Sequence, residues 1–379
     1  MRLAKITTRT EIGEQLGLSP ASISRIVRRL LNEGLVLEEP GESEGLGRNA
    51  NAIRFNELAG SVIAIDLGGT KCLGVLADLL GNVLYEEERP SFANGNPEEN
   101  LLTTIENLFK ASLELELPVR SLGIGIPAVL DPDTGLITSG PNVQWEDFDL
   151  VSLLRGRLDE PFIIDNDVNL AALGEAWRGI GVDAHSFVTF SFGTGIGAAV
   201  VIDGELIRGR HNAAGEVGNI LADRSQIQNF GPNLEHLISG AALVNGAREY
   251  MAKSPEKSEL SQIEITPRSI FEAASRGDGV AQQVISDLVE HIALVVTNCI
   301  AFIDPELVVF EGSIGRALEP YLGRIEDLVE RAMCRRPIIS TSTLGPNATI
   351  IGAIASALLL DIETRTPMTQ VSQRRLPVS

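Results

Sequence analysis

One pattern occurs twice in this chain and constrains its fold more than any other feature: a strand, a Gly-Thr turn and a second strand. In the first copy, an apolar run at 62–65 leads through Asp66 into Gly68-Gly69-Thr70. In the second copy, the run 187–192 leads into Gly193-Thr194-Gly195. A bend with so little side-chain bulk lets backbone N–H groups approach a phosphate closely. One glycine-rich turn is weak evidence, but a matched pair predicts two similar α/β units that hold one polyphosphate between them.

The chain has 379 residues and a net charge of −20, a length that corresponds to two or three domains. Residues 1–55 contain eight basic residues and seven glutamates, so they carry +1 and the remainder carries −21. This division confines DNA contact to the first segment. We find neither a signal peptide nor an apolar run near the ~18 residues of a membrane span. The three cysteines have no metal-ligand spacing, so we expect a cytoplasmic protein.

Residues 1–58 are predicted to form a compact helical module. Thr8 and Glu11 have the spacing of a capping box, and Ser19-Pro20 is typical of the start of a second helix. In the second helix one face is apolar and predicted to be buried; it consists of Ile23, Ile26, Val27 and Leu30. Two short strands are expected at 35–37 and 52–55, separated by a polar loop. This order of elements is that of a winged helix-turn-helix.

The opposite face of the second helix carries hydroxyl groups near its start and arginines further along. Such a helix suits the major groove of DNA, where serines reach base edges and arginines reach bases or phosphates. The predicted DNA-binding residues are Arg9, Ser19, Ser22, Ser24, Arg25, Arg28, Arg29 and, in the loop between the strands, Arg48. The alternative is a small helical packing module with a solvated arginine face.

The rest of the chain is predicted to form one α/β domain with two lobes. The first lobe covers 59–180, and a C-terminal helix at 349–363 packs back on it. The second lobe covers 181–348. A long polar connection at 128–148, which includes Asn142, interrupts the first lobe, and connections of this length usually have a function.

A buried strand of the first lobe ends in Asp165-Asn166-Asp167. Polar residues at the carboxyl end of such a strand face the crevice in which α/β sheets bind ligands. Asp167 could accept a proton from a substrate hydroxyl, and Asn166 could bind a neighbouring hydroxyl. The alternative is that Asp165 or Asp167 caps the following helix.

Three further residues of the second lobe are candidates for a site. Glu216 and Glu235 could accept hydrogen bonds from sugar hydroxyls; the alternative is two solvated surface glutamates. Gly312 follows a buried strand and could form a turn beneath a nucleotide base. His291, on a long apolar helix, is expected to be a structural histidine with its hydrogen bonds satisfied.

Together these residues make the chain similar to the ROK family of repressors, open reading frames and kinases. The resemblance spans essentially the whole chain and implies an actin-like, ribonuclease-H-like sugar kinase fold behind a winged helix-turn-helix. Residues 66–71 resemble the first phosphate loop of the family and residues 193–197 the second. Asn166-Asp167 resembles the sugar-binding asparagine and the catalytic base, and Gly215-Glu216-Val217-Gly218 resembles a sugar-binding segment.

The resemblance implies three sets of site residues. The catalytic residue is Asp167. The sugar-binding residues are Asn142, Asn166, Asp167, Glu216, Asn219 and Glu235. The residues for ATP and Mg²⁺ are Asp66, Gly68, Gly69, Thr70, Lys71, Gly193, Thr194, Gly195 and Gly312.

Two departures from the family pattern change what we expect. The usual zinc-binding His and Cys positions are occupied here by Asn219, Gln226, Gln228 and Asn233. Amides cannot replace thiolates, so we predict no zinc. Glu311 stands where a glycine is common in the adenosine motif, and an acid is unfavourable beside a nucleotide.

Two functions remain open. The one we favour is a sugar-responsive transcriptional repressor, a homodimer or homotetramer that binds operator DNA through the winged helix and a sugar in the cleft. The alternative, compatible with the first in one chain, is an ATP-dependent sugar kinase in which Asp167 deprotonates a sugar hydroxyl.

Overall fold

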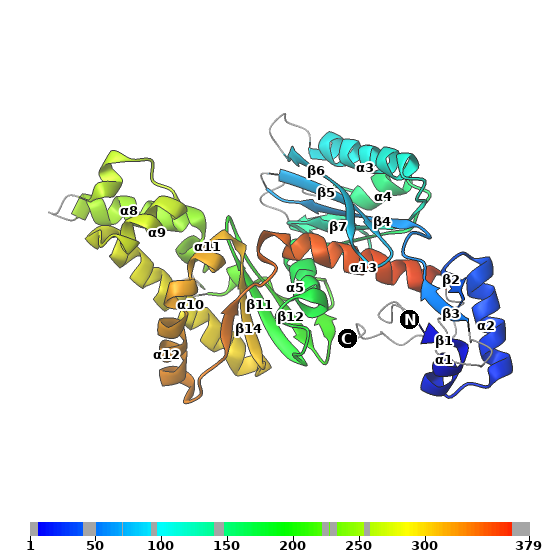
Figure 1. The fold of residues 1–379 in the computed structure, drawn as a ribbon. Helices are drawn as coiled ribbons and strands as arrows, with labels where there is room; N and C mark the ends of the chain where they lie inside the picture. The colour runs from blue at the N-terminus through cyan, green and yellow to red at the C-terminus, as the bar shows by residue number, and fades with distance from the viewer. Residues whose placement is uncertain are drawn as a thin grey trace.

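The computed structural model describes residues 7–40, 51–69, 71–91, 97–139, 148–221, 227, 233–253 and 258–365 (Figure 1). Three of the predicted site residues, Arg48, Thr70 and Asn142, lie outside these ranges, as do Gln226 and Gln228.

The N-terminal module contains two helices and a small sheet. Its elements are β1 (Thr7–Thr8), α1 (Arg9–Leu16), α2 (Pro20–Asn32), β2 (Val36–Glu39) and β3 (Ala52–Phe55), and the strand order is β1-β3-β2. Thr8 and Glu11 form the predicted capping box, and the Ser19 side chain accepts from the Ser22 N–H at the start of α2. These local signals are confirmed because capping depends only on residues three positions apart.

One part of the predicted apolar stripe on α2 is wrong. The core of the module consists of Ile12, Ile23, Val27, Val36 and Ile53. Ile26, however, is 41% exposed. The reason is that α1, β2 and Ile53 of β3 gather on the narrow face of Ile23 and Val27, and Ile26 lies outside that face.

The first lobe is built on a five-stranded sheet of order β10-β7-β4-β5-β6. Its strands are β4 (Ser61–Leu67), β5 (Lys71–Asp78), β6 (Val83–Pro90), β7 (Val119–Ile126) and β10 (Phe162–Asn166). Helices α3 (Pro97–Glu114) and α4 (Leu150–Arg155) contribute to one core cluster, and α5 (Asp167–Arg178) and α13 (Ala348–Arg365) to another. A short hairpin, β8 (Val129–Leu130) and β9 (Ile137–Ser139), extends from β7.

The second lobe repeats this plan with a sheet of order β13-β12-β11-β14-β15. Its strands are β11 (Ser186–Phe192), β12 (Ile196–Ile202), β13 (Glu205–Ile207), β14 (Leu307–Glu311) and β15 (Ile339–Thr341). In each sheet the first strand is central, pairs antiparallel with the second strand and parallel with a later one. The two Gly-Thr turns therefore occupy equivalent places, between β4 and β5 and between β11 and β12.

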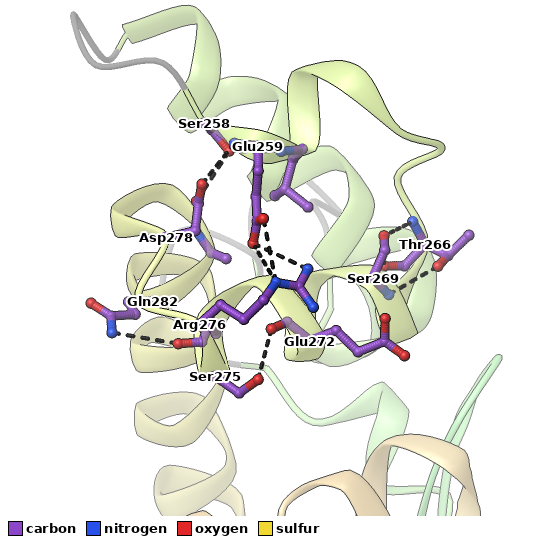
Figure 2. A network of polar contacts seen from close by, with 12 residues as sticks. Ser258, Glu259, Thr266, Ser269, Glu272, Ser275, Arg276, Asp278 and Gln282 are labelled. Carbon is purple, nitrogen blue, oxygen red and sulfur yellow. Dashed lines mark hydrogen bonds and ion pairs between the residues drawn. The ribbon is translucent and has the colours of Figure 1, made fainter.

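The helices of the second lobe gather beside its sheet (Figure 1). They are α7 (Glu235–Ile238), α8 (Gly240–Lys253), α9 (Pro267–Ser275), α10 (Gly279–Ile303), α11 (Gly312–Ala317) and α12 (Leu322–Met333), with 3₁₀ turns η1 (Val217–Asn219), η2 (Glu259–Gln262), η3 (Glu319–Tyr321) and η4 (Gly345–Asn347). Figure 2 shows how polar contacts hold η2, α9 and α10 together: Asp278 caps α10 and also accepts from the Ser258 hydroxyl, and Arg276 pairs with Glu259.

Two helices correct an expectation from the sequence. By length and composition alone, α10 and the segment Gly345–Arg365 are apolar enough to cross a membrane. Half of the apolar window in α10 and 61% of that in the second segment are buried inside the protein, so both act here as core helices. On α10, the expectation of a fully satisfied His291 is also wrong, because its buried Nδ1 has no hydrogen-bond partner among the described residues.

Helix α13 is the element that joins the parts of the molecule. It packs against β4, β7 and α5, and Figure 1 shows its C-terminal end beside the winged helix module. Leu35 and Phe55 of that module pack against the cluster to which α13 contributes Ile354 and Leu358. At its first turn, the Thr349 hydroxyl donates to the backbone oxygen of Asp167 at 3.3 Å.

The chain passes between the two sheets twice, and the carboxylate of Glu175 binds both passages. Glu175 lies on α5 and has no exposed surface. It accepts from the Ile180 N–H in the first passage at 2.8 Å. It also accepts from the hydroxyls of Ser342 and Thr343 and the N–H of Leu344 in the second. These four donors satisfy a buried charge that would otherwise be costly.

Candidate functional site

A cavity of about 210 Å³ opens between the two lobes. Its walls include most of the predicted site residues of both lobes: Gly69, Asn166, Asp167, Gly193, Thr194, Gly195, Glu216 and Glu235. Asp66, Gly68, Lys71, Asn219 and Gly312 are not among its lining residues. The fold thus brings together the two Gly-Thr turns and the acids of the predicted sugar site, which are up to about 170 positions apart in the sequence.

The three polar side chains at the carboxyl end of β10 make different contacts. Asn166 is the N-cap of α5, because its side-chain oxygen accepts from the N–H groups of Val168 and Asn169. The Asp165 carboxylate accepts from Arg208 at 2.7 Å and from Asn169 at 2.8 Å. The alternative that Asp165 or Asp167 caps the helix is therefore wrong, and Asp167 remains as the acid of this segment that lines the cavity.

Burial and mutual repulsion perturb the acids around the cavity. Burial, and then the charges of Asp66 and Glu311, raise the pKa of Asp167 to about 8. Burial and then Glu311 raise the pKa of Asp66 to about 7, although Lys71 opposes the shift. Asp167 is therefore mostly protonated at neutral pH. It becomes a carboxylate that can accept a proton from a substrate only as the pH approaches 8.

A turn that requires glycine precedes Glu216, one of the sugar-binding candidates of the second lobe. Gly215 has φ +91, and a Cβ there would lie 1.8 Å from the Ala198 oxygen, so only glycine fits. The following residue, Glu216, lines the cavity, where burial and the charge of Glu235 raise its pKa. The alternative of two solvated surface glutamates does not describe this pair, since both line the cavity and neither is exposed.

Polar contacts link Asn219 and Asn233, the two residues at the family's zinc-binding positions that the structure describes. The Asn233 amide donates to the Asn219 oxygen at 3.3 Å, and the Asn233 oxygen lies 2.7 Å from His236 Nδ1. Within the described ranges, no three His, Cys, Asp or Glu side chains are grouped so as to hold a metal ion. The absence of zinc stays a prediction, because two of the four positions lie outside those ranges.

Sequence reasoning missed several polar residues of the cavity wall, among them Ser191 and Asn212. Ser191 is the penultimate residue of β11, and Asn212 lies in the connection after β13 with φ +54. The Asn212 amide donates to the Leu130 oxygen and so links the second lobe to the β8–β9 hairpin. Neither residue belongs to a motif; only the high polarity of the segment Arg208–Asn212 was available as a signal.

The predicted DNA-binding residues that the structure describes lie on α1, on α2 and at the N-cap of α2, and they fall into two groups. Some are engaged within the module: Arg9 pairs with Glu38, Arg29 pairs with Glu33, and the Ser19 and Ser22 hydroxyls contact each other. Ser24, Arg25 and Arg28 are exposed, and no hydrogen bond or ion pair joins them to other described residues. Among the described residues, these three side chains are exposed and have no polar partner.

Each of the two parts of the chain matches the model of a known protein family. The model of the ROK family matches residues 62–359, and a model described as winged helix-turn-helix DNA-binding matches residues 6–36. The chain is 30% identical over 373 residues to a xylose repressor of Caldicellulosiruptor bescii, which covers 93% of this chain and 92% of the repressor.

Two solved structures resemble the structure of this chain along most of its length. A ROK family transcriptional regulator, a homolog of the E. coli MLC protein, superposes with a TM-score of 0.78 at 24% identity, covering 94% of this chain and 93% of that one. A ROK family glucokinase from Streptomyces griseus in complex with glucose and AMPPNP superposes with a TM-score of 0.67 at 26% identity, covering 79% and 99%. The predicted fold, a two-lobed sugar kinase fold behind a winged helix-turn-helix, is confirmed.

Proposed function

This chain belongs to the ROK family, and from that premise we propose that it is a sugar-responsive transcriptional repressor. The winged helix contacts operator DNA, and a sugar binds in the cleft between the lobes. The observation that carries the proposal is the combination, in one chain, of α2 with its free Arg25 and Arg28 and a cleft lined by Asp167, Glu216 and Glu235. A sugar kinase needs only the second of these.

The packing of α13 supports a link between the two sites. Its first turn contacts the backbone of Asp167, and its later residues belong to the apolar cluster against which Leu35 and Phe55 of the winged helix module pack. A sugar that changes the position of α5 therefore acts on a helix that the DNA-binding module touches. We propose a homodimer or homotetramer as the DNA-bound form, since two recognition helices are needed to read successive major grooves.

The direct test is DNA binding measured by fluorescence anisotropy with the DNA upstream of the protein's own gene. Arg25→Ala and Arg28→Ala should each weaken binding and lower the slope of log K against log salt by about 1 if the arginine contacts a phosphate. Arg331→Ala is the matched control, because Arg331 is an exposed arginine on α12 in the second lobe. Equal binding by wild type and both α2 variants would contradict the proposal.

The effector is proposed to be a neutral sugar. The name of the repressor relative makes xylose the first sugar to test, followed by glucose and an N-acetylhexosamine. The correct sugar should release the protein from DNA, and Glu216→Gln should shift the release to higher sugar concentration because a buried acceptor of hydroxyl groups is weakened. A sugar that releases wild type and Glu216→Gln at the same concentration would show that the cleft is not the effector site.

The second candidate is an ATP-dependent sugar kinase, and the placement of Asp167 in the cleft favours it. ATP and Mg²⁺ are the cofactors that this candidate requires. An assay of ADP release over the same sugars tests it, and activity that is lost in Asp167→Asn would establish it.

A further inference from the structure

The loop 208–214 connects β13 to the sugar-binding segment of the second lobe. Its base is closed, because the Ala214 N–H donates to the Arg208 oxygen at 3.1 Å. The next residue, Gly215, is attached to β12 through its oxygen, which accepts from the Ala198 N–H at 2.7 Å. The loop is therefore a fixed part of the second lobe, and a contact between it and the first lobe holds the two lobes together.

Arg208 forms an ion pair with the first lobe. Its Nε and Nη2 groups donate to the same oxygen of Asp165, Oδ2, at 3.1 and 2.7 Å. The other carboxylate oxygen accepts from the Asn169 amide and from the Asn166 N–H, each at 2.8 Å. Asp165 is 9% exposed, so the arginine balances a charge that is largely removed from water.

This ion pair lies directly beside the predicted sugar site. Asp165 immediately precedes Asn166 and Asp167, which line the cavity, and Asn212 of the loop lines the same cavity. The Asn212 amide also donates to the Leu130 oxygen of the β8–β9 hairpin at 3.1 Å. Two contacts from one loop thus join the lobes at the wall of the cavity.

The chain itself joins the lobes further along α5. Its two passages meet at Glu175, which lies eight residues beyond Asp167, or about 12 Å along a helix. The first lobe supplies Asp167 to the cavity wall, and the second lobe supplies Glu216 and Glu235. The connection at Glu175 alone does not set the distance between these walls, whereas a second connection at Arg208 does.

We infer that Arg208 is a positioning residue for the sugar site, because its ion pair with Asp165 holds the sugar acceptors of the second lobe within reach of a sugar that Asp167 contacts. The inference rests on the cleft of the proposed function. Lobes that are fixed before the sugar arrives need less ordering on binding, so the affinity for the sugar is higher.

The experiment is isothermal titration of the full chain with xylose, glucose and N-acetylglucosamine in a double-mutant cycle. Arg208→Ala and Asp165→Asn each remove the ion pair, and the asparagine keeps an oxygen for the Asn169 amide. Arg208→Lys restores the charge, and Arg208→Gln replaces the alanine variant if that variant does not fold. The control is Arg210→Ala in the same loop: Arg210 pairs with Asp133 of the first lobe, but their side chains are 68% and 65% exposed, and exposed pairs contribute little.

We expect Arg208→Ala and Asp165→Asn each to weaken sugar binding by about tenfold or more, and the double variant to be within about threefold of the weaker single variant. Arg208→Lys should bind at least about threefold more tightly than Arg208→Ala, and Arg210→Ala should stay within about threefold of wild type. Wild-type affinity in Arg208→Ala would overturn the inference. So would a double variant whose loss is the product of the two single losses, because the two side chains would then act independently.

Amide hydrogen exchange without sugar separates this inference from the proposed function. In Arg208→Ala, but not in Arg210→Ala, exchange should become faster in residues 129–137 of the first lobe and in 208–217 of the second, since the contact between them opens. Unchanged exchange in both segments would overturn the inference whether or not a sugar binds. Faster exchange in a protein that binds none of the three sugars would instead refute the proposed function, while the connection between the lobes would stand.

Discussion

Replacing Gly352 by alanine tests the close crossing of α5 and α13. A Cβ at Gly352 would lie 1.7 Å from the Leu170 oxygen and 3.0 Å from the Gly174 nitrogen. Across the same contact, a Cβ at Gly174 would lie 2.3 Å from the Ala348 oxygen. The neighbouring atoms belong to backbone, so no rotation of a side chain relieves the overlap. The two helices must separate.

Two opposing effects set the size of the change. Alanine is favoured over glycine in a helix interior by about 1 kcal/mol, which would stabilise the protein. Against this, restoring an ordinary carbon–oxygen distance requires the helices to move apart by about 1.5 Å, and overpacking of this kind costs about 1–3 kcal/mol or more. The separation also loosens the apolar contacts of Leu170 and Leu173 with Ile350 and Ala353. We therefore expect Gly352→Ala to lower the free energy of unfolding by about 2 kcal/mol.

Urea unfolding followed by circular dichroism and by the fluorescence of Trp177 measures this change, because Trp177 lies on α5 three residues beyond Gly174. The matched control is Gly246→Ala, inside α8, where a Cβ would meet nothing within 4 Å. There only helix propensity acts, so we expect a gain of about 0.5–1 kcal/mol. If Gly352→Ala is as stable as wild type or more stable, the close packing of α5 on α13 is refuted as the reason for its glycines.

Three further predictions concern single side chains. Asp167 has a pKa of about 8 in the folded protein against an ordinary value of 3.8, so the folded state keeps a proton that the unfolded chain loses between about pH 4 and 8, and stability falls as the pH rises through that window. Asp167→Asn should therefore lose less thermal stability than wild type between pH 5 and 8, and parallel melting-temperature profiles would contradict this. Glu175→Ala should lower the free energy of unfolding by about 3 kcal/mol or more, because buried donors from both interlobe connections lose their acceptor; a loss below 1 kcal/mol by urea unfolding would argue against that role. Thr8→Ala should cost about 1 kcal/mol in the winged helix module through loss of the capping box, measured as weaker DNA binding at raised temperature, and an unchanged temperature profile would count against it.

How far the sequence predicts the structure depends on the range of the interactions concerned. The capping box of Thr8 and Glu11 and the glycine-rich turns were predictable because they involve residues a few positions apart. The repeat of a strand, a turn and a strand also predicted two similar lobes, since each copy builds the centre of one sheet. These local patterns, together with the family resemblance, predict Asp167, Glu216 and Glu235 at one site from the sequence alone.

Features that depend on distant partners could not be predicted in the same way. Asp165 and Asp167 are equivalent by sequence, and only the position of Arg208, 43 residues away, determines that Asp165 is ion-paired. The exposure of Ile26 depends on how little of α2 its neighbours cover. The contacts of Glu175 reach residues 167 to 169 positions away, and no pattern near Glu175 in the sequence predicts these contacts.

The position of Glu175 has a mechanical consequence. Because one carboxylate binds both chain passages between the lobes, it lies at the natural pivot for any rotation of one sheet against the other. Helix α13 begins beside this pivot and, with 18 residues, extends about 26 Å toward the winged helix module. A rotation of about 10° would displace its far end by about 4 Å, which exceeds the length of a hydrogen bond to a base. A ligand that closes the cleft slightly would therefore move the end of α13 that lies beside the winged helix module.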